Sequence, residues 1–535
     1  MAEIPKPVVL IVLDGFGVSL ESRGNAIARA KTPNLEAVQA LYPFTTLQAS
    51  GIAVGLPWGE PGNSEVGHLT MGTGRAIYQH LTRIINAISD GSFFENAALR
   101  HAADHVRAHQ SRFHLFGLVS SGSVHSYIDH LYALLEFAKR QNLAPVFLHV
   151  ITDGKDAPPT EAAGFLQAFE ERLAHEYSFA VIASLVGRFW AMDRDLQWER
   201  IRKAHELLAA GKGQPMTNPV TNLRECYRRG ITDEFIEPTY AIDAAGRPLG
   251  RLAPGDALIL FNFREDSMRE ITESFAKEAF NAFPRRVPEN VRVVTMTEYG
   301  QNLEGVEAAF PPLAIDWPLS RVLSANGKGQ LHIAETEKYA HVTYFFNGGV
   351  EKPFPAEDRI LVPSASLAHF DEHPEMRAPE ITEKILAELD GYDFILGNYA
   401  NADMVGHTGN FEAAVKAIEV LDAMVGQLER AVLERGGVLI ITGDHGNAEK
   451  KIHPISGEPL TEHTINPVPF YLIGKAFERP QPRSAEEIQV KRKETGGLLS
   501  DVAPTILELL DLPKPPEMTG KSLLPLLLRE YDLDT

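Results

Sequence analysis

The stretch "VVLIVLDGFG" at residues 8–17 decides the fold of this chain. Six apolar residues run directly into Asp14, which two glycines follow closely. A run that is apolar throughout is typical of a parallel strand covered on both faces. Asp14 then lies at the carboxyl end of a strand, which is where α/β sheets bind their ligands.

The same pattern of an apolar run followed by a polar loop recurs along the chain. Further examples are "FHLFGLV" (113–119), "PVFLHVIT" (145–152), "FAVIASLV" (179–186), "DALILFNF" (256–263), "DFILGNY" (393–399) and "GVLIIT" (437–442). Helical patterns separate these runs. The clearest is 410–437, where apolar residues recur every three or four positions and Asn410 is the expected N-cap. Strands that alternate with helices predict an α/β fold.

Size and charge restrict the classes of function. A chain of 535 residues predicts at least two domains, and a net charge of −20 disfavours nucleic acid as a partner. The single cysteine, Cys226, fits a reducing compartment. Residues 8–13 are too few for a membrane span and lack the features of a signal peptide. We therefore expect a cytoplasmic, monomeric protein with no membrane partner.

Ligand-type side chains gather in the polar loops of the first and last parts of the sequence. The set is Asp14, Asp403, His407, Asp444, His445 and His463. Mixed carboxylate and imidazole ligands suit Zn²⁺ or Mn²⁺ and, less well, Mg²⁺. Six ligands exceed what one ion usually takes, so the sequence predicts two metal ions, an arrangement common in phosphoryl chemistry.

The positions of these ligands predict a discontinuous domain. Ligands lie about 2 Å from their ion, so Asp14 has to meet residues 403–463 in one site. Residues 1–79 and 313–535 are then one metal-binding domain, and residues 80–312 are an inserted second α/β domain. Candidate linkers lie near 76–82 and in the Pro-rich stretch near 305–318.

The inserted segment carries a basic cluster in the loops after its strands. Its members are His125, Lys155, Asp156, Arg188, Arg194, Arg264 and Arg269. In a chain of net charge −20 such a cluster indicates an anion site, for which the arginine fork suits carboxylate or phosphate. For Arg194 the alternative is a solvated pair with Asp193 or Asp195.

The stretch "GNSEVGH" at 62–68 presents a serine between two glycines without the spacing of a hydrolase nucleophile turn. Together with "GRFWAMDRD" (187–195), "AETEKYAHVTYFFNGG" (334–349), "NYANADMVGHTG" (398–409), "DHGNAE" (444–449) and "HTINPVPF" (463–470), it resembles the cofactor-independent phosphoglycerate mutases of the alkaline phosphatase superfamily. The motifs occur in order over nearly the whole chain.

This resemblance implies an alkaline-phosphatase-like metal domain with an inserted transferase domain. It implies interconversion of 3-phosphoglycerate and 2-phosphoglycerate with two Mn²⁺ ions and without 2,3-bisphosphoglycerate. One metal site would use Asp14, Ser64, Asp444 and His445, and the other Asp403, His407 and His463. Ser64 would take the phosphoryl group, Lys338 would help bind it, and Asp156 would be the acid/base for the glycerate hydroxyls. Substrate would be bound by His125, Lys155, Asp156, Arg188, Arg194, Arg264 and Lys338.

On this interpretation a metal ion replaces the base that "GNSEVGH" lacks. Glu65 becomes a residue of a helix start and His68 a structural donor. Closure of the inserted domain would keep water away from the phosphoserine.

The substrate domain departs from the family pattern. Lys155 replaces an arginine, and Ser267 stands where the pattern R-x-D-R has its second arginine. These departures leave open a phosphatase or phosphomutase of the same superfamily that acts on another phosphate ester. A metal-stabilised binding protein without catalysis is the alternative from another class, which the complete ligand set disfavours.

Overall fold

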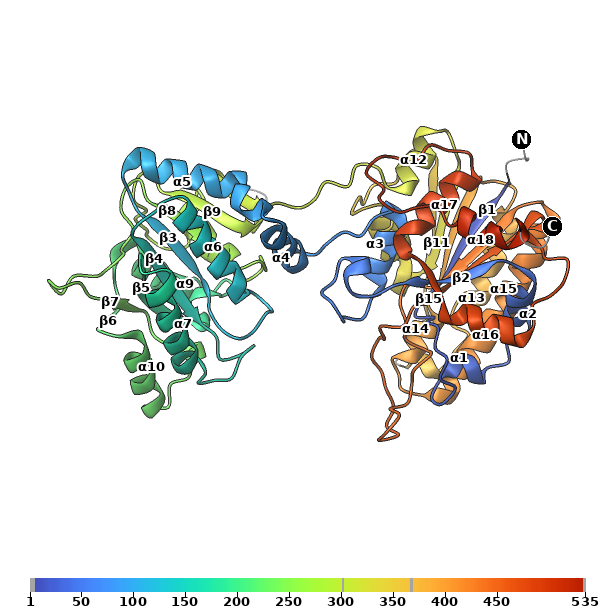
Figure 1. The fold of residues 1–535 in the computed structure, drawn as a ribbon, viewed down its shortest axis with the longest axis horizontal. Helices are drawn as coiled ribbons and strands as arrows, with labels where there is room; N and C mark the ends of the chain where they lie inside the picture. Colours follow the sequence, from blue (N-terminus) through green and yellow to red (C-terminus); the bar gives the residue numbers. More distant parts are fainter. Residues whose placement is uncertain (1–4, 301–302, 366–368, 533–535) are drawn as a thin grey trace. The chain divides into compact units, whose positions relative to one another are not determined.

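The computed structural model describes residues 5–300, 303–365 and 369–532 (Figure 1). The chain divides into two compact units. Unit 1 consists of Met1–Gln79 and Ala314–Thr535, and unit 2 of His80–Leu313. Each unit contains an eight-stranded sheet and helices, so the predicted α/β fold is confirmed. No helix in the described ranges combines the length and the apolar composition that a membrane span requires.

The sheet of unit 1 is mostly parallel, and β1 lies near its centre. Its strands, in spatial order, are β12 (Glu357–Val362), β11 (Gln330–Glu335), β13 (Phe394–Tyr399), β1 (Val8–Leu13), β14 (Val438–Thr442), β15 (Val468–Ile473), β2 (Phe44–Gln48) and β16 (Thr495–Leu498). Only β15 runs antiparallel to its two neighbours. Strand β1 therefore joins segments that lie some 400 residues further along the chain.

The uninterrupted apolar run of β1 is explained by burial on both faces. Val8, Leu10 and Val12 enter one hydrophobic core, and the residues between them enter another. The helices of this unit are α1 (Ala26–Arg29), α2 (Pro33–Leu41), α3 (Ser64–Thr73), α12 (Leu319–Ala325), α13 (Ala378–Glu388), α14 (Asn401–Gly406), α15 (Phe411–Glu434), α16 (Ala485–Lys493), α17 (Val502–Leu509) and α18 (Leu524–Asp532). Helices α12 and α17 contribute to the first core and α2, α13 and α15 to the second.

Helix α15 begins where its sequence predicts. The Oδ1 of Asn410 accepts a hydrogen bond of 3.2 Å from the backbone N–H of Ala413, so Asn410 is the N-cap.

Unit 2 repeats the doubly covered arrangement. The spatial order of its strands is β10 (Val306–Phe310), β9 (Arg292–Thr297), β8 (Ala257–Leu260), β3 (Phe113–Leu118), β4 (Val146–Thr152), β5 (Ala180–Gly187), β7 (Thr239–Ala241) and β6 (Gln214–Met216). Its helices are α4 (His80–Asp90), α5 (Ala97–His109), α6 (Ile128–Arg140), α7 (Ala162–Glu176), α8 (Arg188–Ala191), α9 (Trp198–Ala210), α10 (Pro219–Arg228) and α11 (Arg269–Ala276). Helices α5, α6, α7 and α10 share one core, and α9 and α11 share the other.

Candidate active site

Seven side chains that the sequence singled out as metal ligands lie together in unit 1, around the carboxyl ends of β1, β13 and β14. Asp14 follows β1, Asp403 and His407 stand on and just after α14, and Asp444 and His445 follow β14. His463 precedes β15, and Ser64 is the first residue of α3. Strands that are distant in sequence but adjacent in the sheet bring these residues to one edge.

The three histidines of this group are oriented alike. The Nδ1 atom of His407 lies 2.7 Å from the carbonyl oxygen of Thr461, that of His463 lies 2.9 Å from Gly62 O, and that of His445 lies 3.3 Å from Gly446 O. A carbonyl oxygen accepts, so each Nδ1 carries a hydrogen and each Nε2 is the nitrogen left to bind a cation. This is the arrangement of metal-binding histidines.

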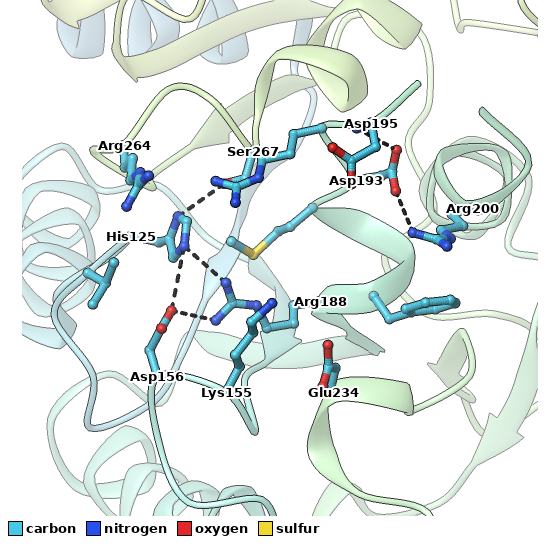
Figure 2. Close-up of a pocket in the computed structure, with 14 residues that line it drawn as sticks. His125, Lys155, Asp156, Arg188, Asp193, Asp195, Arg200, Glu234, Arg264 and Ser267 are labelled. Atoms are coloured by element: carbon cyan, nitrogen blue, oxygen red, sulfur yellow. Dashed lines mark hydrogen bonds and ion pairs between the residues drawn. The ribbon is translucent and has the colours of Figure 1, made fainter. Parts of the chain in front are cut away.

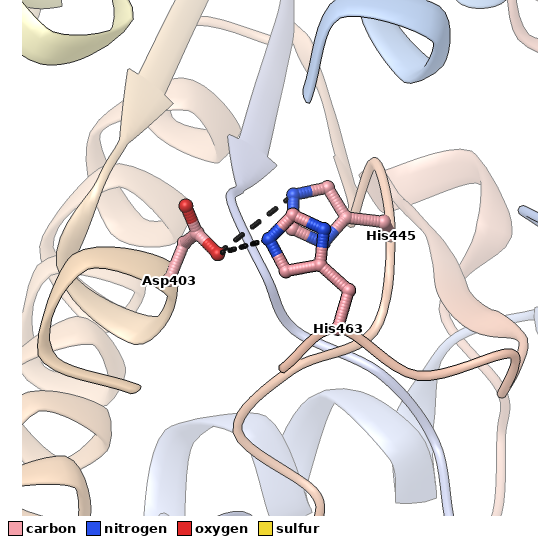
Figure 3. A group of neighbouring side chains, drawn as sticks. All are labelled: Asp403, His445 and His463. Carbon is pink, nitrogen blue, oxygen red and sulfur yellow. Dashed lines mark ion pairs between the residues drawn. The ribbon is translucent and has the colours of Figure 1, made fainter. Parts of the chain in front are cut away.

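The Nε2 atoms point toward buried carboxylates. The Oδ1 of Asp403 lies 3.1 Å from His407 Nε2 and 3.3 Å from His463 Nε2. Figure 3 shows Asp403 facing the rings of His445 and His463. Ligand atoms of these three residues lie within 4.8 Å of one another, which fits a divalent cation.

His445 lies between the two expected metal sites. Its Nε2 atom is 3.5 Å from Asp14 Oδ1, 3.7 Å from Asp444 Oδ2 and 3.8 Å from Asp403 Oδ1. In addition, the Oδ2 of Asp444 is buried and has no hydrogen-bond partner among the described residues. An unsatisfied buried carboxylate oxygen is costly, and a cation would satisfy it.

A second group of ligand-type atoms is formed by Asp14, His68 and Asp444. The ring of His68, however, has both nitrogens engaged. Its Nδ1 lies 2.9 Å from Ser64 O, and its Nε2 accepts from the Nδ2 of Asn398 at 3.1 Å. We therefore assign His68 a structural role, in agreement with the interpretation of the sequence.

Ser64 stands at the amino-terminal end of α3, where the helix dipole favours negative charge. Its Oγ lies 3.0 Å from Asp14 Oδ1 and 3.1 Å from His445 Nε2. Lys338 Nζ donates to Ser64 Oγ at 2.7 Å, to Asp14 at 2.6 Å and to Asp403 at 2.7 Å. Lys338 therefore lies at the centre of the site.

Mutual attraction keeps the site ionised despite its burial. Burial by itself would raise the pKa of Asp14, but Lys338 and His445 outweigh it and hold that pKa below its usual range. Burial opposes the charge of Lys338, yet Asp14 and Asp403 raise its pKa. For His445, burial is outweighed mainly by Asp444 and Asp14, which raise its pKa to about 9. A bound cation would compete with these protons.

Two asparagines that the sequence analysis did not select hold the carboxylates in place. The Nδ2 of Asn398 donates to Asp14 Oδ2 at 2.8 Å as well as to His68. The Nδ2 of Asn447 donates to Asp403 Oδ1 at 2.7 Å, and Lys451 contacts its Oδ1. Their positions at the end of β13 and just after β14 were the signal that could have indicated them.

Unit 2 contains a polar cavity of about 280 Å³ (Figure 2). It is lined by six of the seven residues expected to bind substrate, namely His125, Lys155, Asp156, Arg188, Arg194 and Arg264. Arg188 is the least exposed of the arginines that line it, with a side chain that is 10% exposed, and its Nη1 donates to Asp153 Oδ1 at 2.7 Å and to Asp156 Oδ2 at 2.5 Å. The cavity therefore combines cations with acceptors.

The outer arginines of this cavity share one carboxylate. Arg194 Nη1 lies 2.8 Å and Arg264 Nη2 3.0 Å from Asp266 Oδ2. The alternative that pairs Arg194 with Asp193 or Asp195 is therefore wrong in its partner. Arg269 does not line the cavity, because its Nε donates to the carbonyl oxygen of Tyr299 at 2.9 Å.

Two further carboxylates at or beside the cavity were not anticipated. Asp153 lies behind the lining and organises the loop after β4, since its Oδ1 accepts from the backbone N–H groups of Lys155 and Asp156. Asp193 accepts from Arg200 Nη1 at 2.7 Å on the opposite wall.

Comparison with known proteins agrees with this geometry. A family model described as the Metalloenzyme superfamily matches residues 6–514. The chain is 48% identical over 522 residues to the 2,3-bisphosphoglycerate-independent phosphoglycerate mutase of Moorella thermoacetica, covering 97% of this chain and 99% of that protein. It is 47% identical to the protein of the same name from Clostridium botulinum, with the same coverage. Crystal structures of Leishmania mexicana phosphoglycerate mutase at low cobalt concentration match with 30% identity, a TM-score of 0.53 and 97% coverage of both chains.

Proposed function

Because the chain belongs to the family of 2,3-bisphosphoglycerate-independent phosphoglycerate mutases, we propose that it interconverts 3-phosphoglycerate and 2-phosphoglycerate through a phosphoserine at Ser64. It is an isomerase of the metalloenzyme superfamily and depends on divalent metal. The metals we propose are two Mn²⁺ ions, as the resemblance to this family implies, and mixed carboxylate and imidazole donors are compatible with that ion.

The observation that carries the proposal is the setting of Ser64. Its Oγ lies within 3.1 Å of Asp14, His445 and Lys338, at the amino-terminal end of a ten-residue helix. His445 directs its other ring nitrogen to a backbone carbonyl rather than to a carboxylate, so the pair lacks the third member of a hydrolase triad. The setting favours a nucleophile activated by cations.

The carboxylate, imidazole and hydroxyl groups gathered in unit 1 are suitable ligands for two divalent metal ions. One ion would be held by Asp14, Ser64, Asp444 and His445, and the other by Asp403, His407 and His463. When bound, such ions lower the pKa of the coordinated hydroxyl and neutralise charge on the phosphoryl oxygens.

The first half of the reaction transfers the phosphoryl group to the protein. Ser64 reacts as the alkoxide, its proton having passed to solvent beforehand, and Asp156 starts as the neutral acid. Ser64 Oγ attacks phosphorus, the bond between phosphorus and the glycerate oxygen breaks, and that oxygen takes the proton of Asp156. Lys338 donates hydrogen bonds to the oxygens of the transferred group. The positive end of α3 favours the resulting dianion.

The second half repeats these events at the other hydroxyl of glycerate. That hydroxyl returns its proton to Asp156 as it attacks the phosphoserine, so Asp156 and Ser64 both end in the state in which they began. In the proposal, the cavity of unit 2 holds glycerate meanwhile, with Arg188 as the fork for its carboxylate.

An assay that couples product formation to enolase tests the proposed reaction. Purified protein with Mn²⁺ and 3-phosphoglycerate should form 2-phosphoglycerate at the same rate with and without added 2,3-bisphosphoglycerate. Release of free phosphate without 2-phosphoglycerate would instead identify a phosphatase and contradict the proposal.

The covalent step is tested by Ser64→Ala. This variant should lose turnover while its Mn²⁺ content, measured by mass spectrometry, stays close to that of the wild type. Substantial mutase activity in Ser64→Ala would eliminate the phosphoserine.

A further inference from the structure

Ser267, which follows β8, lies in the wall of the cavity in unit 2. It is buried, with 2% of its surface exposed, and its Oγ lies 3.1 Å from the Nδ1 of His125. Figure 2 shows His125 between Ser267 on one side and Arg188 and Asp156 on the other. The imidazole therefore connects Ser267 to Arg188, the least exposed arginine of the cavity.

The contacts of His125 determine where its hydrogen lies. Arg188 Nη2 is 3.0 Å from His125 Nε2, and a guanidinium group can only donate. His125 Nε2 must therefore accept, which places the ring hydrogen on Nδ1. Ser267 Oγ is then the acceptor of the Nδ1–H, and the hydrogen bonds run from Arg188 to His125 to Ser267.

The same contacts require His125 to be uncharged. Protonation would put a hydrogen on Nε2, where it would face the donor of Arg188 at 3.0 Å, which is closer than the acceptor Asp156 Oδ2 at 3.5 Å. Burial lowers the pKa of His125 to about 4, and the cations Arg188 and Arg264 add to this effect against the opposing carboxylates of Asp156 and Asp266.

The three side-chain contacts of Arg188 show why the position of this hydrogen matters for binding. Its Nη1 donates to Asp153 and Asp156, and its Nη2 donates to His125. The orientation of the fork about its axis is thus set by two carboxylates at one nitrogen and one imidazole at the other. A His125 with its hydrogen on Nε2 would repel Nη2 and turn the fork.

We propose that Ser267 is a positioning residue for substrate binding: by accepting the Nδ1–H of His125, it holds the tautomer that anchors Arg188. This inference rests on the proposed function, because it assumes that Arg188 receives an anionic group of the phosphoglycerate. Ser267 acts through His125 and does not touch the reacting atoms.

Steady-state kinetics of Ser267→Ala with 3-phosphoglycerate tests the inference. Removal of the acceptor leaves a buried donor unpaired, and a loss of that kind changes an equilibrium by about tenfold. KM should rise about tenfold, with kcat changed less than threefold, because Ser267 does not touch the reacting atoms. Ser267→Thr keeps the oxygen and should restore KM to within about threefold of the wild type. Ser178→Ala, an exposed serine of the same unit, is the matched control.

A double-mutant cycle distinguishes action through His125 from a direct effect. In a His125→Asn background, Ser267→Ala should raise KM less than twofold further. A full tenfold further rise would show that Ser267 acts independently and would overturn the inference, as would an unchanged KM in the single variant.

Nitrogen NMR of ¹⁵N-histidine-labelled protein provides a readout that does not depend on activity. His125, assigned by its loss in His125→Asn, should show the Nδ1–H tautomer at pH 7 in the wild type and a mixture in Ser267→Ala. A protonated or Nε2–H ring in the wild type would overturn the inference. If the wild type shows the Nδ1–H tautomer but makes no 2-phosphoglycerate, the proposed function fails and the role of Ser267 toward Arg188 stands.

Discussion

The Nε2 atoms of His407 and His463 lie 3.0 Å apart, although each ring has its hydrogen on the opposite nitrogen. Two lone pairs at this distance repel unless a cation lies between or beside them. We therefore expect the protein to be stabilised strongly by metal. Saturation with Mn²⁺ at a hundred times the dissociation constant should add about 2.7 kcal/mol per bound ion to the free energy of unfolding.

Thermal unfolding with Mn²⁺ and with a chelator measures this effect, and mass spectrometry counts the ions. His463→Ala should reduce the content from two ions per chain to one, whereas His373→Ala, which removes an exposed histidine of the same unit, should leave it at two. Equal melting temperatures with Mn²⁺ and with chelator would contradict the prediction.

Asn398 should be required for metal affinity even though it is not a ligand. Asn398→Ala removes the amide that donates to both Asp14 and His68, so two buried acceptors lose their partner. Removal of such an outer partner typically costs 10–100-fold in metal affinity. Titration of apoprotein with Mn²⁺ measures it. Asn326→Ala, which loses only a bond to the carbonyl oxygen of Val322, should keep wild-type affinity.

Gly67 should not tolerate a side chain, because α3 packs against the loop after β14 at this point. A Cβ there would lie 2.6 Å from the carbonyl oxygen of Asp444. Gly67→Ala should destabilise the protein by about 1–3 kcal/mol and weaken metal binding. Gly164→Ala is the matched change in α7, where nothing lies within 4 Å of the added atom. It should stabilise the protein by about 0.5–1 kcal/mol. Urea unfolding compares the two, and equal effects would contradict the packing argument.

A buried chain of hydrogen bonds in unit 2 should make stability depend on pH. His149 Nδ1 lies 2.7 Å from Ser184 Oγ, His149 Nε2 lies 3.0 Å from His114 Nδ1, and His114 Nε2 lies 3.1 Å from Asp256 Oδ2. The carboxylate only accepts, so the hydrogens run in one direction from Ser184 to Asp256 and both rings are neutral. Burial lowers the pKa of both histidines, that of His149 well below its usual value.

The sign of the pH dependence follows from these shifts. The unfolded chain takes up protons on both histidines as the pH falls below about 6.5, while the folded chain does not. The free energy of unfolding is therefore highest above pH 6.5. It falls on acidification by up to about 1.4 kcal/mol per pH unit for each ring. Urea unfolding between pH 8 and pH 5 measures the slope. His149→Gln should reduce it and His175→Gln, which alters an exposed residue, should not. A slope that is the same in wild type and His149→Gln would contradict the prediction.

The strands and the ligand residues could be predicted because both have local signals. An apolar run such as 8–13 is visible in the sequence, and Asp14 or His445 stands directly at the end of such a run. The contacts between these residues could not be predicted, since they depend on which strands become neighbours. Asn398 illustrates this, because its amide acquires a role only when β13 pairs with β1.

The partners of surface charges were the least predictable feature. Arg194 has acidic neighbours on both sides in the sequence, yet its partner is Asp266, which α9 and α10 separate from it along the chain. Ser267 likewise stood out in the sequence only as a departure from a motif, and its contact with His125 emerged from the packing of the loop after β8 against the loop after β3.

The pairing of β1 with β13 and β14 has a consequence for biosynthesis. At about 5–20 residues per second, on the order of 20–80 s pass between synthesis of β1 and synthesis of the strands that cover its edges. The intervening unit 2 contains its own sheet and both of its cores, so it can fold while the ribosome is still producing the rest. The nascent chain must therefore carry an apolar, unpaired first strand for most of its elongation, and a ribosome stalled between residues 313 and 393 would display a folded insert beside an aggregation-prone amino terminus.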